Sequence, residues 1–285
     1  MALTTPLFTQ HSREWRANRY VYPVISRRSQ GLSIGINLNP DKACNFDCVY
    51  CSVDRTVAGG EAELDLGVLR AELRGMLMLA VSGELFTQEP FDRTPPALRR
   101  LNDVAFSGDG EPTAALQFPL AARVAAEVID ELGADCRIVV ITNATLLSRP
   151  EVVATLAFLD GHRGQVWAKL DAGTQDYFQT VERSKVSLAR VLANITACAQ
   201  VRPVVIQSLF MRLSGAAATA AEIAAYVERL REITLSGGRI SLVQVYTTAR
   251  ATAEDFVSPL TPVEVDAIVD RVRALGLFAQ GFYAP

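Results

Sequence analysis

Short apolar runs alternate with longer amphipathic stretches through most of this chain, and the alternation limits the folds open to it. Six β-α units in series favour a parallel sheet with right-handed crossovers. Six are too few to close an eight-stranded barrel, so the fold class is α/β, an open partial (βα)6 barrel with a parallel sheet. The predicted strands are 33–39, 103–107, 136–142, 165–171, 203–210 and 239–246, and the predicted helices are 62–82, 116–132, 149–159, 186–199, 219–235 and 262–275.

The 285 residues are expected to form a single domain 1–285, although the length alone would permit two. We divide it into an irregular N-terminal extension 1–31, a core 32–250, and a C-terminal helix and tail 251–285. The net charge of −3 gives no overall basic excess for nucleic acid or anionic membranes. The start of the chain lacks a signal-peptide core, and no apolar run approaches the ~20 residues of a spanning helix. A cytoplasmic location is therefore expected.

The N-terminal extension holds the one local basic cluster. Its five arginines face a single acid, Glu14, and tyrosines are interleaved with them. The cluster is either a solvated or docking extension or a contact for phosphate or another anionic substrate. The arginines are Arg13, Arg16, Arg19, Arg27 and Arg28.

Three cysteines lie within eight residues, in the segment CNFDCVYC. Cys44, Cys48 and Cys51 have the spacing C-x3-C-x2-C, and the five cysteines of the chain do not suggest a disulfide framework. Three thiolates can hold three irons of a cubane cluster and leave the fourth iron open, whereas electron-transfer clusters use four cysteines. The alternatives are a zinc site or three incidental reduced thiols. Zinc could be completed by His11, His162, Cys136 or Cys198, none of which has a paired zinc-type spacing.

Polar residues follow the predicted strands, where ligands gather in parallel sheets. Asn37 and Asn39 share a face of the first strand and are either ligand contacts or hydrogen-bonded interior amides. Two glycines in the segment 107–113 (SGDGEPT) allow a tight turn and a close approach to a ligand. Asn143 follows the third strand and either contacts a ligand or forms an Asx-turn.

The last three strands carry further candidates. Lys169 and Asp171 are two residues apart, face one side and need partners inside a barrel, either each other or a ligand. The remaining candidates are Gln207 and Ser208 on opposite faces of the fifth strand, and Gln244 and Tyr246 on one face of the sixth. Cys136 and Cys198 are expected to be buried, inert thiols.

Five segments of the chain resemble motifs of the radical S-adenosylmethionine (SAM) superfamily. In order along the chain they are NLNPDKACNFDCVYC, SGDGEPT, ITN, KLDAGTQDYF and VQVYTTAR. Within it they are similar to the subgroup related to the tRNA wyosine-synthesis enzymes. Ala144 stands where that subgroup usually has glycine, so the local turn is expected to differ. The archaeal wyosine-forming enzymes carry additional N-terminal cysteines, and the first 43 residues here contain none. The wyosine reaction is therefore not assigned.

The resemblance implies a 4Fe-4S cluster on Cys44, Cys48 and Cys51, with SAM bound to the open iron. It places Tyr50 near the adenine and the segment Ser107, Gly108, Asp109, Gly110 and Glu111 near the methionine amino group. Lys169 and Asp171 would suit the carboxylate and the amino, sulfonium or ribose groups of SAM, with Asn143, Gln207 and Tyr246 as further contacts. No catalytic acid or base is identified.

Three functions follow as hypotheses. The first is an enzyme that takes one electron from a donor such as flavodoxin or ferredoxin and cleaves SAM reductively to methionine and a 5′-deoxyadenosyl radical. That radical abstracts hydrogen from an unidentified small molecule, peptide or nucleotide. The second is a radical SAM enzyme that modifies bases of RNA (tRNA). The third is a non-catalytic iron–sulfur or zinc-binding regulatory module.

Overall fold

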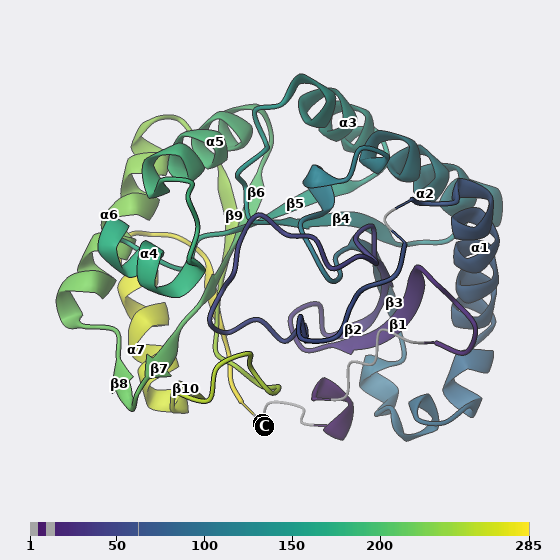
Figure 1. Ribbon diagram of the computed structural model, residues 1–285, viewed down its shortest axis with the longest axis horizontal. Coiled ribbons are helices and arrows are strands. Elements are labelled where there is room, and N and C mark those ends of the chain that lie inside the picture. Colours follow the sequence, from purple (N-terminus) through teal and green to yellow (C-terminus); the bar gives the residue numbers. More distant parts are fainter. Residues whose placement is uncertain (1–4, 10–14, 62, 285) are drawn as a thin grey trace.

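The computed structural model describes residues 5–9, 15–61 and 63–284, and they form a curled sheet with helices on its outer side (Figure 1). The strand order is β1-β2-β3-β4-β5-β6-β9-β11; β1 runs antiparallel to β2, and every other neighbouring pair is parallel. The strands are β1 (Val21–Ser26), β2 (Gly31–Ile36), β3 (Leu101–Phe106), β4 (Arg137–Thr142), β5 (Gly164–Lys169), β6 (Val204–Leu209), β9 (Ile240–Tyr246) and β11 (Ala279–Phe282).

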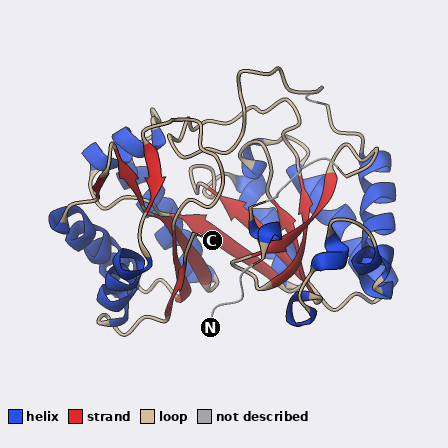
Figure 2. Ribbon diagram, turned by 90° about the horizontal axis from the view of Figure 1, so that it is seen from below, coloured by secondary structure: helices blue, strands red, loops and turns tan. Residues whose placement is uncertain are grey.

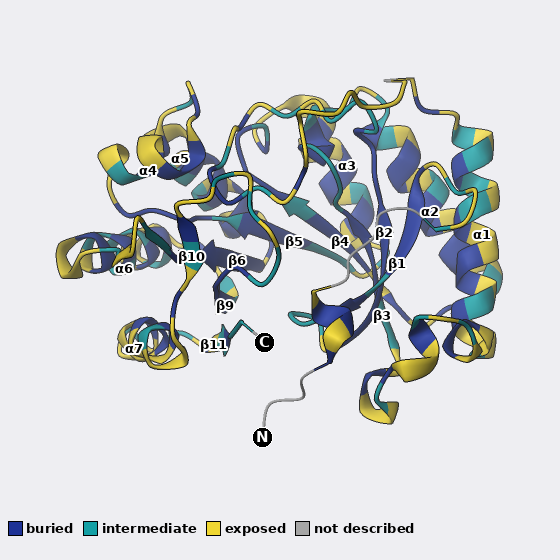
Figure 3. Cartoon of the chain, turned by 60° about the horizontal axis from the view of Figure 1, so that its bottom comes forward, coloured by how far each residue is buried: buried dark blue, intermediate teal, exposed yellow. Residues whose placement is uncertain are grey.

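In the described part of the chain, seven α-helices cover the convex side of the sheet or flank its edge, and the strands lie between them (Figure 2). Their outer faces are exposed while the strands are buried (Figure 3). Pro150 and Pro262 each occupy the first turn of a helix, and Gly133 ends another in the left-handed conformation, φ 57°. The helices are α1 (Leu66–Ser82), α2 (Phe118–Leu132), α3 (Pro150–Asp160), α4 (Gln175–Glu182), α5 (Leu188–Val201), α6 (Ala220–Leu235) and α7 (Pro262–Arg273).

The main core lies between the sheet and the helices. Ile34 and Ile36 point into it from β2, whereas Ser33 and Gly35 of the same strand line the hollow on the concave side. The alternation predicted for the first strand is therefore confirmed, with the polar side inward. A small second sheet, β10-β7-β8, adds β7 (Met211–Leu213), β8 (Ala216–Ala217) and β10 (Val257–Pro259).

The open α/β half-barrel is confirmed, and its ends correct the expected division of the chain. The extension 1–31 is not wholly irregular, because β1 lies within it and pairs with β2 along its full length. Pro23 obscured this strand, yet β1 is an edge strand, where proline is tolerated. The tail is more than a helix, because β11 joins β9 as a seventh parallel strand.

Other boundaries move by a few residues. The first predicted strand, 33–39, ends at Ile36, and the fourth, 165–171, ends at Lys169, so Asn39 and Asp171 lie in loops. Helix α4 was not predicted, because its eight residues follow directly on the loop after β5. Among the described residues, no helix is long and apolar enough to cross a membrane.

Candidate functional site

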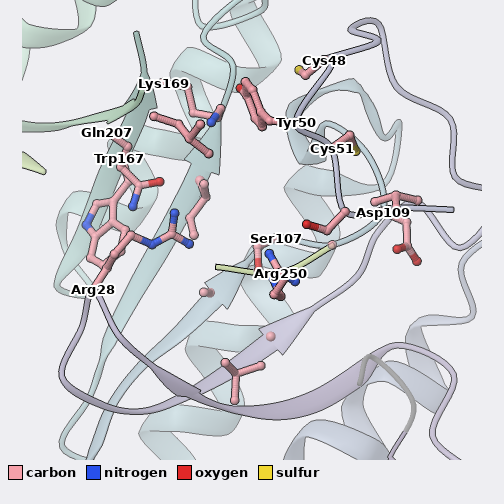
Figure 4. Close-up of a pocket in the computed structure, with 18 of the residues that line it drawn as sticks. Arg28, Cys48, Tyr50, Cys51, Ser107, Asp109, Trp167, Lys169, Gln207 and Arg250 are labelled. Carbon is pink, nitrogen blue, oxygen red and sulfur yellow. The ribbon is translucent and has the colours of Figure 1, made fainter. Parts of the chain in front are cut away.

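A cavity of about 280 Å³ opens on the concave side of the sheet, toward the carboxyl ends of the parallel strands (Figure 4). The loop 37–65 crosses over the centre of the curl in Figure 1. The side chains around the cavity come from this loop and from most strands of the sheet. Of the predicted site residues, the three cysteines, Tyr50, the segment 107–111, Asn143, Lys169, Gln207 and Tyr246 line it. Asp171 does not, but it contacts Tyr50 and Lys169, which do. The further candidates Asn37, Asn39, Ser208 and Gln244 do not line it either.

Cys44, Cys48 and Cys51 are free, half-buried thiols on this loop. Backbone hydrogen bonds hold the loop against the end of α4: Asp47 N donates to Glu182 O at 3.1 Å, and Val49 N donates to Val181 O at 2.9 Å. The three sulfur atoms therefore lie on one backbone segment, and contacts with α4 hold that segment in place.

The glycines of SGDGEPT make room for the cysteine loop. A Cβ on Gly110 would lie 2.0 Å from Ala43 O, and one on Gly108 would lie 2.4 Å from Asn37 Oδ1. The close approach predicted from the glycines exists, but the group that approaches is the protein backbone and side chains. Asn37 is correspondingly an interior amide: its Nδ2 donates to Asp109 Oδ2 at 2.6 Å and its Oδ1 accepts from Asp109 N at 3.1 Å.

Glu111 ties three loops together. Its buried carboxylate accepts hydrogen bonds from Thr142 Oγ1 at 2.6 Å and Asn143 N at 2.7 Å, and from Thr113 as well. Asn143 Nδ2 in turn donates to Asn45 Oδ1 at 2.7 Å, within the cysteine loop. Burial raises the pKa of Glu111, and these donors oppose the rise. Ala144, which follows Asn143, has a φ of 64°. This alanine therefore adopts the left-handed backbone conformation that glycine favours.

A buried charged cluster lies at one side of the cysteine loop. Lys169 Nζ lies 3.1 Å from Asp171 Oδ2 and donates to Tyr246 Oη at 3.0 Å. Its ammonium also sits 4.7 Å from the centre of the Tyr50 ring, whose hydroxyl donates to Asp171. Asp171 Oδ1 accepts from Leu209 N at 2.6 Å. Lys169 and Asp171 therefore form the mutual ion pair that was one of the two alternatives for them.

Glu182 completes this cluster, and sequence reasoning missed it. Cys48 Sγ donates to Glu182 Oε2 at 2.6 Å, and Tyr50 Oη donates to Glu182 Oε1 at 3.1 Å. Glu182 is the last residue of α4, so without that helix nothing placed it near Cys48. The sequence feature that could have indicated Glu182 is its place as an acid at the end of a short amphipathic segment after the KLDAGT motif.

Burial controls the ionisation of the cluster. It raises the pKa of Glu182, and repulsion from Asp171 adds to the rise. It also raises the pKa of the Cys48 and Cys44 thiols. Burial opposes the charged form of Lys169, but attraction by Asp171 and Tyr246 outweighs it and the lysine pKa is raised.

Gln207 and Gln244 form a second polar layer. Gln207 Nε2 donates to Gln244 Oε1 at 2.7 Å, and both side chains are buried. Ser208 points the opposite way, as predicted, and shares a hydrogen bond of 2.7 Å with Tyr226. Asn39 is buried beside Gly110, and its backbone N–H donates to Asn37.

Cys44, Cys48 and Cys51 are the side chains that could hold an iron–sulfur cluster. No three His, Cys, Asp or Glu side chains within 5–9, 15–61 and 63–284 are arranged around a single ion. A cubane cluster does not need its three thiolates around one ion, because each thiolate binds a different iron. Arg55 Nη1 donates to Cys51 Sγ at 3.0 Å, so Cys51 has a charged donor beside it.

The side chains that could complete a zinc site lie elsewhere. Cys136 precedes β4, Cys198 lies near the end of α5, and His162 precedes β5, which places all three at the amino ends of the strands. The cysteine loop follows the carboxyl end of β2. Cys136 and Cys198 are buried as expected, and burial raises the pKa of Cys136 to about 12. His11 lies outside the described residues.

Solved structures with a similar fold are radical SAM proteins. A radical SAM methyltransferase from Sphaerobacter thermophilus has a TM-score of 0.59 and 14% identity, covering 88% of this chain and 66% of that chain. Native anSMEcpe with bound AdoMet has a TM-score of 0.57 and 14% identity over 87% of this chain and 63% of that one. TYW1 with a lysine-pyruvate adduct has a TM-score of 0.52 and 14% identity over 86% and 74%. The predicted resemblance is thereby confirmed at the level of the fold.

Curated relatives match over shorter stretches, and no family model matches the chain. The UPF0026 protein MJ1312 of Methanocaldococcus jannaschii is 33% identical over 135 residues, which are 46% of this chain and 34% of that protein. The GTPase Obg of Brachyspira hyodysenteriae is 25% identical over 170 residues, 59% of this chain and 21% of that protein. The chain thus spans a third or less of these relatives. It has no Gly-Lys dipeptide and hence no phosphate-binding P-loop of the GTPase type.

Proposed function

We propose that this chain, which has the fold of radical SAM enzymes, is itself such an enzyme. Cys44, Cys48 and Cys51 would hold a 4Fe-4S cluster whose open iron binds SAM. When bound, this pair of cofactors supplies reductive cleavage of SAM to methionine and a 5′-deoxyadenosyl radical that abstracts hydrogen from a substrate. A one-electron donor such as flavodoxin or ferredoxin is part of the proposal.

One observation carries it: three free thiols in the C-x3-C-x2-C spacing border a single cavity at the carboxyl edge of a curled parallel sheet. Four cysteines would saturate a cluster, and three leave one iron for a ligand. The two remaining cysteines lie at the other end of the strands, so neither can supply the fourth thiolate without a rearrangement of the fold.

The chain's own residues would position and shield the cofactors. Lys169 offers a half-buried positive charge at the cavity for a carboxylate, and Asp171, its buried partner, offers a negative one for an amino group or for ribose hydroxyls. Tyr50 already contacts Lys169 through its ring, at the position proposed for the adenine. The crossing loop covers the cavity and limits the access of water to radical chemistry.

We also propose that the whole chain acts as one domain. The first strand of the extension and the last strand of the tail both belong to the main sheet. The described arginines behind the RNA hypothesis each have separate contacts: Arg16 donates to Gln88 and Arg19 pairs with Glu61, both at the surface, whereas Arg27 binds carbonyls of Thr247 and Tyr283 and Arg28 lines the cavity. Arg13 lies outside the described residues. No observation therefore favours tRNA over another substrate.

The test is anaerobic reconstitution with iron and sulfide, followed by reduction in the presence of SAM. We expect about four irons and four sulfides per chain, and 5′-deoxyadenosine detected by chromatography and mass spectrometry. Cys48→Ala should lose both the iron and the product, whereas Cys198→Ala, a buried thiol outside the cavity, should keep both. About one zinc without sulfide, or full iron content in Cys48→Ala, would refute the proposal.

A further inference from the structure

The end of the cavity farther from the cysteine loop carries positive charge that cluster and SAM binding do not require. Arg28 lies there, and Arg27 and Arg250 line the same cavity. Arg27 is engaged, since it donates to Thr247 O at 3.0 Å and to Tyr283 O. Arg28 is different: its guanidinium lies 4.7 Å from the centre of the Tyr246 ring and makes no hydrogen bond or ion pair with any described residue.

The three guanidinium groups are close enough to affect one another. Burial lowers the pKa of Arg27 to about 10, and the charges of Arg28 and Arg250 contribute to the lowering. Of the acids that line the cavity, Glu111 is held by its loop donors, and Asp103, whose pKa burial raises, accepts from Ser33 while the charge of Arg28 opposes that rise. A bound anion would relieve the mutual repulsion of the arginines.

A second observation points to a ligand beside these arginines. Gln207 is fully buried and lines the cavity, and its Oε1 has no hydrogen-bond partner among the described residues. A buried acceptor left unpaired is costly, and a hydroxyl or N–H donor on a bound molecule would satisfy it.

The two features lie within the reach of one small molecule. Gln207 pairs in register with Gln244 on β9, and Tyr246, whose ring contacts Arg28, is two residues further along β9. Two residues of a strand span roughly 6.6 Å and point to the same face. Figure 4 shows Arg28, Trp167 and Gln207 grouped on the side of the cavity away from Cys48 and Cys51.

We propose that this end of the cavity binds a small organic anion, whose phosphate or carboxylate contacts Arg28 and whose own hydrogen-bond donor reaches Gln207 Oε1. The planar guanidinium fork suits either oxyanion. The inference rests on the proposed function, in which this molecule is the substrate, and it excludes a wholly apolar or cationic substrate.

Trp167 provides the means to test it. It lines the cavity, and Trp15, which packs on Phe91 at 5.5 Å, is the one other tryptophan of the chain. In a Trp15→Phe background, the fluorescence of Trp167 would report binding to the full chain without a cluster. The probes are glycerol 3-phosphate, malate, sulfate and glycerol. Calorimetry on reconstituted protein with SAM would repeat each titration.

We expect saturable binding of glycerol 3-phosphate or malate, and whichever is tighter identifies the oxyanion; glycerol should not bind. Arg28→Gln should weaken binding about tenfold or more, while Arg190→Gln, the same charge change on an exposed arginine of α5, should not. Gln207→Leu should weaken binding of glycerol 3-phosphate but not of sulfate, which has no donor.

Equal binding by wild type and Arg28→Gln would overturn the inference. So would competition between SAM and the probes, because the arginines would then hold the SAM carboxylate. The same experiments distinguish a failure of the anion site from a failure of the proposed radical SAM function. Production of 5′-deoxyadenosine without anion binding rejects only the anion site, and anion binding without SAM cleavage rejects only the radical SAM activity.

Discussion

At the residue scale, the site depends on buried charges that satisfy one another before any ligand arrives. Lys169, Asp171 and Glu182 bring one basic and two acidic groups into contact with Tyr50 and Cys48. Such a cluster is stable only while its members remain paired, because a lone buried charge has lost its hydration. Each member therefore affects the stability of the fold as well as the binding of a ligand.

Asp171→Asn tests this coupling. The Asp171 side chain is fully buried, and the substitution leaves Lys169 without its nearest carboxylate. We expect a loss of about 3 kcal/mol in the free energy of unfolding, measured by denaturant titration. Glu228→Gln, which breaks the exposed pair with Arg231, should change stability little. Similar losses in both variants would show that the buried pair has no special weight.

At the element scale, the loop that carries the cysteines is shaped by the loop after β3. The backbone at Ala43 lies where a side chain on Gly110 would be, and Asn37 bonds to Asp109 across the same contact. Helix α4 fixes the other side of the cysteine loop through backbone hydrogen bonds. The spacing of the cysteines becomes a ligand geometry only because two separate elements hold the segment between them.

Gly110→Ala should therefore displace the loop that carries the three cysteines, although Gly110 is not itself part of that loop. Its Cβ would meet Ala43 O at 2.0 Å, so the loop has to move. We expect a clear drop in iron bound per chain after reconstitution, with the secondary structure retained in circular dichroism. Gly75→Ala is the matched control, since a Cβ there meets nothing within 4 Å in α1. It should leave iron binding unchanged and stabilise the helix by ~0.5–1 kcal/mol. Equal iron content in the two variants would contradict the role given to Gly110.

At the scale of the whole molecule, the sheet curls but does not close, and β1 and β11 are its unpaired edges. Arg27 lies in the turn between β1 and β2 and donates to carbonyls of Thr247 and Tyr283, which lie beyond the ends of β9 and β11. One side chain thus connects the first and last parts of the sheet across its open side. This connection keeps Arg28, the next residue, facing the cavity.

Arg27→Met should loosen that connection. The methionine keeps an apolar stem but leaves two carbonyls without their charged donor, so we expect unfolding free energy to fall by about 2 kcal/mol. Amide hydrogen exchange should rise in β1 and β11 before the central strands. Arg239→Met, which removes an exposed arginine bonded to Val201 O, should have a much smaller effect. Uniform exchange across the sheet in Arg27→Met would argue against a connection at the open side.

The sequence by itself determined the periodic features of this protein. The strand–helix alternation, the inward face of β2 and the helix ends at Gly133, Pro150 and Pro262 follow from local periodicity and backbone restrictions, and the structure has them. It also placed candidate site residues at the carboxyl ends of parallel strands, which meet at one edge of the sheet. The spacing of Cys44, Cys48 and Cys51 specified a candidate ligand set without its geometry.

Only the tertiary structure decided which of these residues touch. Glu182 reaches Cys48 across 134 positions, and Arg27 reaches Tyr283 across 256, so no local pattern records either contact. Strands β1 and β11 are short and gain stability only by pairing at the edges of an existing sheet. Burial then sets which carboxylates ionise and leaves Gln207 with an unpaired oxygen. The sequence pattern therefore identified the candidate site residues, and long-range packing determined which side chains each of them contacts.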